Sequence, residues 1–137
     1  MPSLHSPQGA IYFLQILFSL LLAIGFLQSS IDKLVNWRGN LDWLTGHFAK
    51  SPLAGIVPIL LFVLTILELS SGILSGIGFV LLLVGHSTTV AFLGAVVSTI
   101  TVAALFFGQR LAKEYAGAAV LVSYFFLAAG AVYLLSL

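Results

Sequence analysis

Residues 53–85 read LAGIVPILLFVLTILELSSGILSGIGFVLLLVG, a long apolar run in which Glu68 is the only ionisable side chain. A helix needs about 20 apolar residues to cross the ~30 Å hydrocarbon core of a bilayer. The run is too long for one upright crossing and too short for two crossings with a turn. We expect one long, tilted membrane helix over about residues 56–82. A helix broken at the Ser-Ser-Gly of residues 70–72, as in transporter sites, is the alternative.

Three further apolar runs lie on either side of this one, over about residues 10–31, 88–107 and 115–135. The chain has 137 residues, of which 61% are hydrophobic and 7% charged. A soluble domain carries roughly 25% charged residues. This chain has too few charged residues to form the surface of a water-soluble protein. The first run is too long, and too poor in preceding basic residues, for a signal peptide. The sequence therefore predicts an all-α, single-domain (1–137) integral membrane bundle of four helices.

Charge and cysteine content exclude several classes of function. The net charge is +1 and the five basic residues are scattered, so no nucleic-acid surface is expected. The chain has no cysteine, which excludes disulfides, thiolate metal sites, Fe–S clusters and CxxC redox chemistry. We expect no metal and no cofactor of its own, with a quinone as the one cofactor to consider. An electron-transfer role would need a partner or a bound organic cofactor.

The orientation in the membrane follows from the basic residues. Lys33, Arg38 and Lys50 lie between the first two predicted helices, and Arg110 and Lys113 lie between the last two. The N-terminal tail and the middle connection have none. Basic residues in short loops mark the cytoplasmic side. Both charged loops are therefore expected in the cytoplasm, and both termini on the opposite side.

The segment of residues 32–52, DKLVNWRGNLDWLTGHFAKSP, predicts a short helix lying in the membrane interface. Leu41, Leu44 and Phe48 fall on one helical stripe, and Asn40 is a suitable N-cap. An amphipathic helix of this kind lies flat at the boundary between lipid and water. Candidate contacts to headgroups or to a ligand, here and in the second basic loop, are Trp37, Arg38, Trp43, His47, Lys50, Arg110 and Lys113.

Two interpretations of these charged residues remain open. They can anchor the helix ends among lipid headgroups, or Arg38, His47 and Lys50 can gather around an anionic group or a quinone headgroup. In the second loop, Arg110 is either a plain topology signal or a partner of Asp32 or Asp42. Such a pair would close the cytoplasmic end of the bundle.

Glu68 is the most informative single residue. A charge at mid-bilayer costs roughly 2.5–3.5 kcal/mol, so Glu68 should face the bundle interior, be neutral, or both. Gln15, Ser19 and Tyr124 are the hydrogen-bond partners that we expect for its carboxyl group. Small and polar residues follow Glu68 along one helix face, and a matching face occurs on the third helix. The candidate site comprises Glu68, Ser71, Gly72, Ser75, Gly76, Ser98, Thr101 and Tyr124. It is either a polar contact that holds the helices together or a proton-carrying or ligand-binding carboxyl in a cavity.

Three segments carry a resemblance to a known family: LQSSIDKLVNWRGNLDWLTGHFAKSPL (27–53), LELSSG (67–72) and LFFGQRLAKEYAGAA (105–119). With them the chain resembles the DoxX family, particularly its short bacterial members. The resemblance implies a four-helix protein of the bacterial inner membrane. That family is named for a membrane subunit of a thiosulfate:quinone oxidoreductase, and most of its members have no established activity. Related proteins are linked to redox homeostasis or act beside other membrane proteins. It implies no catalytic residue at any position of this chain.

The leading hypothesis is a non-catalytic subunit or accessory protein of a bacterial membrane complex. Its partners would be membrane lipid and other membrane subunits or a second copy. The contact surfaces that we expect are the glycines of the second helix and Ala128, Gly130 and Ala131 of the fourth. The alternative is a quinone-reactive subunit of an oxidoreductase that uses Glu68 with Arg38, His47 and Lys50. A small transporter is the third hypothesis.

Overall fold

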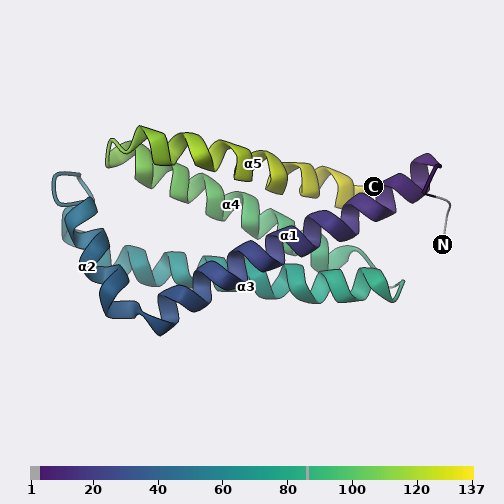
Figure 1. The fold of residues 1–137 in the computed structure, drawn as a ribbon, viewed down its shortest axis with the longest axis horizontal. Coiled ribbons are helices and arrows are strands. Elements are labelled where there is room, and N and C mark those ends of the chain that lie inside the picture. The colour runs from purple at the N-terminus through teal and green to yellow at the C-terminus, as the bar shows by residue number, and fades with distance from the viewer. Residues whose placement is uncertain (1–3, 86) are drawn as a thin grey trace.

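The computed structural model describes residues 4–85 and 87–137 and is helical almost throughout (Figure 1). The elements are α1 (Pro7–Val35), α2 (Trp37–His47), the 3₁₀ turn η1 (Ala54–Ile56), α3 (Val57–Leu83), α4 (Thr89–Leu111) and α5 (Tyr115–Ser136). No strand occurs in the described residues. Four helical segments of the described residues are each long and apolar enough to cross a membrane: α1, α3 with its η1 turn, α4 and α5. The all-α fold with a short helix between the first two long ones is confirmed, and the chain is a multi-pass integral membrane protein.

α1 is longer than the sequence predicted, and its C-terminal end changes the place of two charged residues. Ser6 caps the helix start by accepting a hydrogen bond from the Gly9 N–H, at 3.1 Å. The helix continues beyond residue 31 to Val35. Asp32 and Lys33 therefore belong to its last turn and not to a loop. α2 follows at once, with Asn36 in place of Asn40 as its N-cap residue.

α3 runs without a break from Val57 to Leu83, through residues 70–72. The alternative of a helix broken at these residues is therefore excluded. Its 27 residues, at about 1.5 Å each, extend about 40 Å. This is longer than the ~30 Å hydrocarbon core, so a tilted crossing is required.

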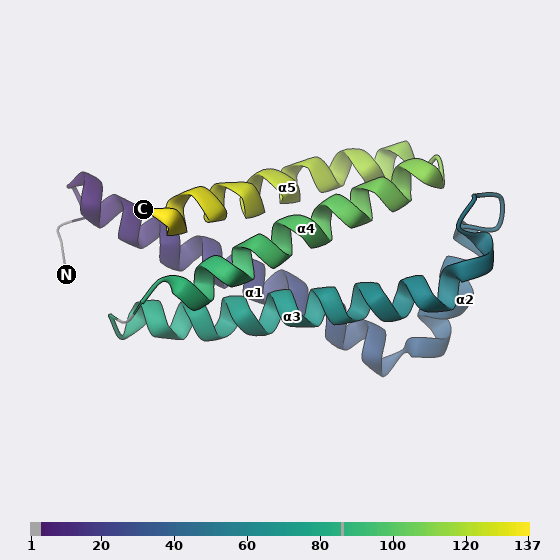
Figure 2. The same cartoon turned by 180° about the vertical axis from the view of Figure 1, so that it is seen from behind.

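The helices form two antiparallel pairs, α1 with α3 and α4 with α5, which diverge toward α2 (Figures 1 and 2). The pairs approach most closely at the opposite end, where both termini lie. A Cβ on Gly78 would lie 2.4 Å from the Ala91 Cα, and one on Gly94 would lie 2.7 Å from the Ser75 N. Only glycine permits α3 and α4 to touch backbone to backbone in this way.

Side chains from α1 complete this closed end. The Gln15 amide donates to the Leu134 carbonyl at 2.7 Å, and the Tyr12 hydroxyl donates to the Leu82 carbonyl. The buried apolar cluster of the protein consists of Leu22, Leu82, Ala91, Ala95, Ala128, Ala131 and Leu135. The bundle is therefore a wedge, closed at the end that holds the termini and held apart at the α2 end.

The small residues that we expected to contact other proteins are instead used within the chain. Ala128 and Ala131 are fully buried in the bundle, and a Cβ on Gly130 would lie 3.1 Å from the Phe18 ring. On α3, Gly72 and Gly76 face α1. Ala128 and Ala131 are therefore not outer contact surfaces, and for these two residues the prediction was wrong. Gly76 and Gly130 are half-buried, and Gly72 and Gly76 line an open groove beside α1, so contact with a partner through these glycines stays a prediction.

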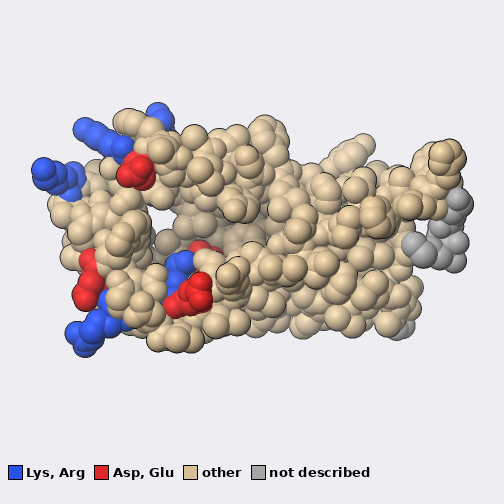
Figure 3. Space-filling model, viewed as in Figure 1, with Lys and Arg blue, Asp and Glu red and all other residues tan. Residues whose placement is uncertain are grey.

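The charged residues gather at the α2 end of the molecule (Figure 3). Both basic connections, from α1 to α3 and from α4 to α5, lie at this end, and both termini lie at the other (Figure 1). On the face drawn in Figure 3, acidic and basic atoms also lie inside a hollow between the two helix pairs.

Candidate functional site

Glu68 is buried inside the wedge, with 2% of its surface exposed, and binds two side chains of α1. The Ser29 hydroxyl donates to Glu68 Oε2 at 2.7 Å, and Lys33 Nζ lies 3.0 Å from the same oxygen. Lys33 Nζ also donates to the Ser29 hydroxyl at 2.9 Å. We call these three residues the Lys33–Ser29–Glu68 cluster. It combines an ion pair and a hydrogen bond between α1 and α3 with a second hydrogen bond within α1.

The contact between α1 and α3 explains why these three side chains meet. Ser29 and Lys33 are four residues apart on α1 and therefore share a helix face. One turn after Glu68, a Cβ on Gly72 would lie 2.8 Å from the Leu27 side chain and 2.9 Å from its backbone nitrogen. The absence of a side chain at Gly72 lets α1 approach closely and places Ser29 and Lys33 opposite the carboxylate.

The partners that the sequence suggested for Glu68 do not bind it. Gln15 bonds to the Leu134 carbonyl, and the buried Ser19 hydroxyl has no hydrogen-bond partner in residues 4–85 and 87–137. The reason is the antiparallel register of α1 and α3. Ser29 lies 14 residues after Gln15 on α1, which is about 21 Å along the helix axis. Gln15 is therefore far too distant, and this part of the prediction was wrong.

Ser29 and Lys33 are thus the site residues that sequence reasoning missed. Ending the first helix at residue 31 placed Lys33 in a loop, where it was counted only as a topology signal. A signal was available, because a buried carboxylate needs a cation or donors nearby. Lys33 lies only two residues after the predicted end of an apolar span, and Ser29 stands one turn before it.

A cavity of about 300 Å³ opens beside the cluster, between α1, α4 and α5. We call it the Glu68 cavity. Its polar lining residues are Gln28, Ser29, Glu68 and Tyr124. Within the described residues, the side chains of Gln28 and Tyr124 make no hydrogen bond, and both are exposed, so both polar groups are available to a ligand. Tyr124, which the sequence assigned to the site, therefore lines the same space as Glu68 without touching it.

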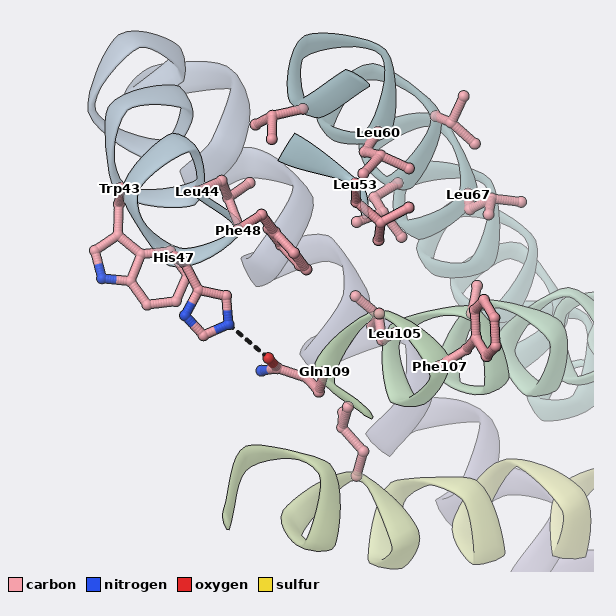
Figure 4. Close-up of a pocket in the computed structure, with 16 residues that line it drawn as sticks. Trp43, Leu44, His47, Phe48, Leu53, Leu60, Leu67, Leu105, Phe107 and Gln109 are labelled. Carbon is pink, nitrogen blue, oxygen red and sulfur yellow. Dashed lines mark hydrogen bonds between the residues drawn. The ribbon is translucent and has the colours of Figure 1, made fainter. Parts of the chain in front are cut away.

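A second cavity of about 340 Å³ lies under α2, between α3 and α4 (Figure 4). We call it the α2 cavity. Its wall is almost entirely apolar, with His47 and Gln109 at one side. His47 Nε2 forms a hydrogen bond of 2.8 Å with Gln109 Oε1, and the His47 ring stacks on Trp43 with 4.6 Å between ring centroids. These contacts fasten α2 to α4 across the open end of the wedge. Two side chains, Leu105 and Leu121, line both cavities.

Six members of the predicted site pack helices together and line neither of these cavities: Ser71, Gly72, Ser75, Gly76, Ser98 and Thr101. Ser71 and Thr101 join α3 to α4 through a buried hydrogen bond of 3.2 Å between their hydroxyls. Ser98 donates to the Gly94 carbonyl of its own helix at 2.7 Å. The small and polar stripe after Glu68 thus holds α3 against its two neighbours.

The charged residues of the connections remain at the surface. Arg38 stands nine residues before His47 on α2, which is two and a half turns, so the two side chains leave opposite sides of the helix. They do not gather around one group. Arg110 lies over the Tyr115 ring, 4.5 Å from its centroid, and forms no ion pair with Asp32 or Asp42 in the part of the chain described. Lys50 and Lys113 are likewise exposed, while Trp37 is half-buried.

Comparison with protein-family models, with curated proteins and with solved structures gave no match for this chain. The geometry of the site itself therefore carries the functional conclusion.

Proposed function

We propose that this integral membrane protein is a non-catalytic, ligand-binding subunit in a bacterial inner membrane, and that its ligand is an amphiphile of the quinone type. The observation that supports this most directly is the Lys33–Ser29–Glu68 cluster, of which Ser29 and Glu68 form part of the wall of an open cavity. A cluster that served only to hold α1 against α3 would need no space beside it. Here about 300 Å³ lies next to the carboxylate, within the ~300–1,000 Å³ typical of ligand sites.

The Glu68 cavity offers the hydrogen bonds that a quinone headgroup requires. Quinone carbonyl oxygens accept hydrogen bonds, which the Gln28 amide of α1 and the Tyr124 hydroxyl of α5 can donate from the cavity wall. The hydroxyl groups of the reduced form donate, and the Glu68 carboxylate can accept. The Ser29 hydroxyl gives its one hydrogen to Glu68 Oε2 and so holds the carboxylate in place beside the cavity. The remaining wall is apolar, as an unsaturated ring requires.

The role that we propose is binding and not electron transfer. Reduction of a quinone consumes two electrons and two protons. A chain without cysteine has no thiol and no thiolate-bound centre from which to supply electrons. In our proposal the electrons come from a membrane partner, and this subunit holds the ligand for it. The resemblance of residues 27–53 and 105–119 to the DoxX family supports the same assignment.

Titration of the purified protein in lipid nanodiscs with a short-tailed benzoquinone, followed by calorimetry, tests the proposal. We expect saturable binding that Ser29→Ala weakens by about tenfold, the effect of one lost hydrogen bond to a charged network. Ser29→Ala keeps the ion pair at 3.0 Å and should fold normally. Glu68→Gln should weaken binding at least as much. Glu114→Gln, which alters an exposed carboxylate that does not line the cavity, should bind like the wild type.

Two results would contradict this function. The first is a wild-type protein that shows no saturable binding of the quinone or its reduced form. The second is equal affinity in the wild type, Ser29→Ala and Glu68→Gln, each confirmed as folded by circular dichroism. If binding is absent while Glu68→Gln lowers the unfolding temperature, the cluster is a packing contact only.

A further inference from the structure

The α2 cavity carries an inference that rests on the proposed function and makes it more specific. Its lining contains two polar side chains with hydrogen-bonding groups near the mouth, His47 and Gln109, and these already bond to each other at 2.8 Å. Besides the Trp43 indole, this bond leaves a headgroup only the second ring nitrogen of His47 and the Gln109 amide N–H at one side of the cavity, and no charged side chain lines it. The cavity suits an apolar chain, whose only requirement is close packing.

The two cavities adjoin. Leu105 of α4 and Leu121 of α5 form part of both walls, so the cavities are neighbours across these two side chains. Each cavity alone is near the lower limit of the size range of ligand sites, and a ligand that turned these leucines aside would occupy a space well within that range. The charged group stands in one cavity, at Glu68, and the other cavity, under α2, has an almost entirely apolar wall.

From this arrangement we infer that the ligand has a single long apolar tail, which enters the α2 cavity while its headgroup rests on the Lys33–Ser29–Glu68 cluster. α2 then forms the cover of the tail site, in addition to lying at the membrane interface. The bond between His47 and Gln109 holds this cover onto α4 (Figure 4). The ligand class is thus an isoprenoid or alkyl amphiphile, not a free ring.

Lipid tails are as apolar as leucine, so a tail that moves from bilayer to protein gains packing and not hydrophobic free energy. The expected preference for a long tail is therefore modest, about five- to tenfold at equal mole fraction in the bilayer. The experiment compares two benzoquinones with the same headgroup, one with a single isoprenoid unit and one with four. Affinities are measured in nanodiscs at matched mole fraction.

Two variants fill the α2 cavity in different ways. Leu64→Trp enlarges a side chain in its wall. Gly108→Leu adds a side chain where an ideal Cβ has only the Phe48 ring nearby, at 3.8 Å, and it replaces a poor helix former with a good one. The control is Ile66→Trp, at a side chain on α3 that is 48% exposed and lines neither cavity.

We expect both filling variants to lose the preference for the long tail while their affinity for the short-tailed quinone stays at the wild-type value. Ile66→Trp should keep the preference. Equal wild-type affinity for the two quinones would overturn the tail site and leave the headgroup site intact. An equal weakening of both quinones by Gly108→Leu would also overturn it. Failure of the wild type to bind either quinone would instead refute the proposed function.

Discussion

At the scale of single residues, the ion pair between Lys33 and Glu68 is a contact that is costly to break from one side. The side chain of Glu68 is 2% exposed and that of Lys33 is 17% exposed. Each charge compensates the other in a place where water cannot. Removing one partner of a buried pair typically costs about 3–5 kcal/mol, because the other charge stays behind unpaired. Replacing both by apolar or neutral groups costs far less.

A double-mutant cycle tests this coupling. We expect Lys33→Met and Glu68→Gln each to lower the free energy of unfolding by about 3 kcal/mol. The double variant should lose less than the sum of the two, since it leaves no unpaired charge. Denaturant unfolding in detergent micelles measures all four proteins. The matched cycle at the exposed Lys113 and Glu114 should be additive within about 0.5 kcal/mol. Additivity at Lys33 and Glu68 would show that the pair is not coupled.

At the scale of helices, the sequence was sufficient for the existence of each membrane helix and insufficient for its ends. Apolar runs of this length have no other stable form in a bilayer. The end of α1 was missed because Asp32 and Lys33 look like the start of a polar loop. In the structure Lys33 is helical, and its side chain binds Ser29 of the same helix and Glu68, which lies 35 positions further along the chain. Such a contact is invisible to any local pattern.

The close approach of α3 to α4 gives a prediction at this scale. Gly78→Ala should destabilise the protein by about 1–3 kcal/mol, because its Cβ would lie 2.4 Å from the backbone of Ala91, which cannot move aside. Gly25→Ala is the control, since a Cβ there meets nothing within 4 Å. We expect it to be neutral or to stabilise α1 by up to about 1 kcal/mol. Thermal unfolding followed by circular dichroism compares them, and equal midpoints would contradict the close contact.

At the scale of the whole molecule, the positions of the basic residues led to the expectation that both charged connections share one side of the membrane. The structure places them at one end, as alternating crossings require. The divergence of the helix pairs toward that end could not be predicted. The sequence contains Gly72, Gly78 and Gly94, but it does not reveal which of them meet a neighbouring backbone. The cavities depend on which helices meet at these glycines, so they could not be predicted from the sequence either.

The sidedness of the molecule is open to a direct test, because the natural chain has no cysteine. Single cysteines at Asp42 and Lys113 should both react with a membrane-impermeant maleimide only after the cells are opened. A cysteine at Ser136 should react in intact cells. The physical reason for this expectation is the positive-inside rule, which predicts that the basic connections lie in the cytoplasm. Labelling of Asp42→Cys and Lys113→Cys on different sides would contradict the fold itself, and labelling of both from outside would reverse the orientation.

The ion pair beside the Glu68 cavity has an electrical consequence. Moving one elementary charge across a membrane against 100 mV takes about 2.3 kcal/mol. The two opposite charges here lie only 3.0 Å apart, roughly a tenth of the ~30 Å hydrocarbon thickness. Their combined coupling to the voltage is therefore no more than about 0.2 kcal/mol per 100 mV. An uncharged ligand can enter and leave such a site without electrical work, so its occupancy should follow the ligand supply and stay the same whether the cell is energised or depolarised.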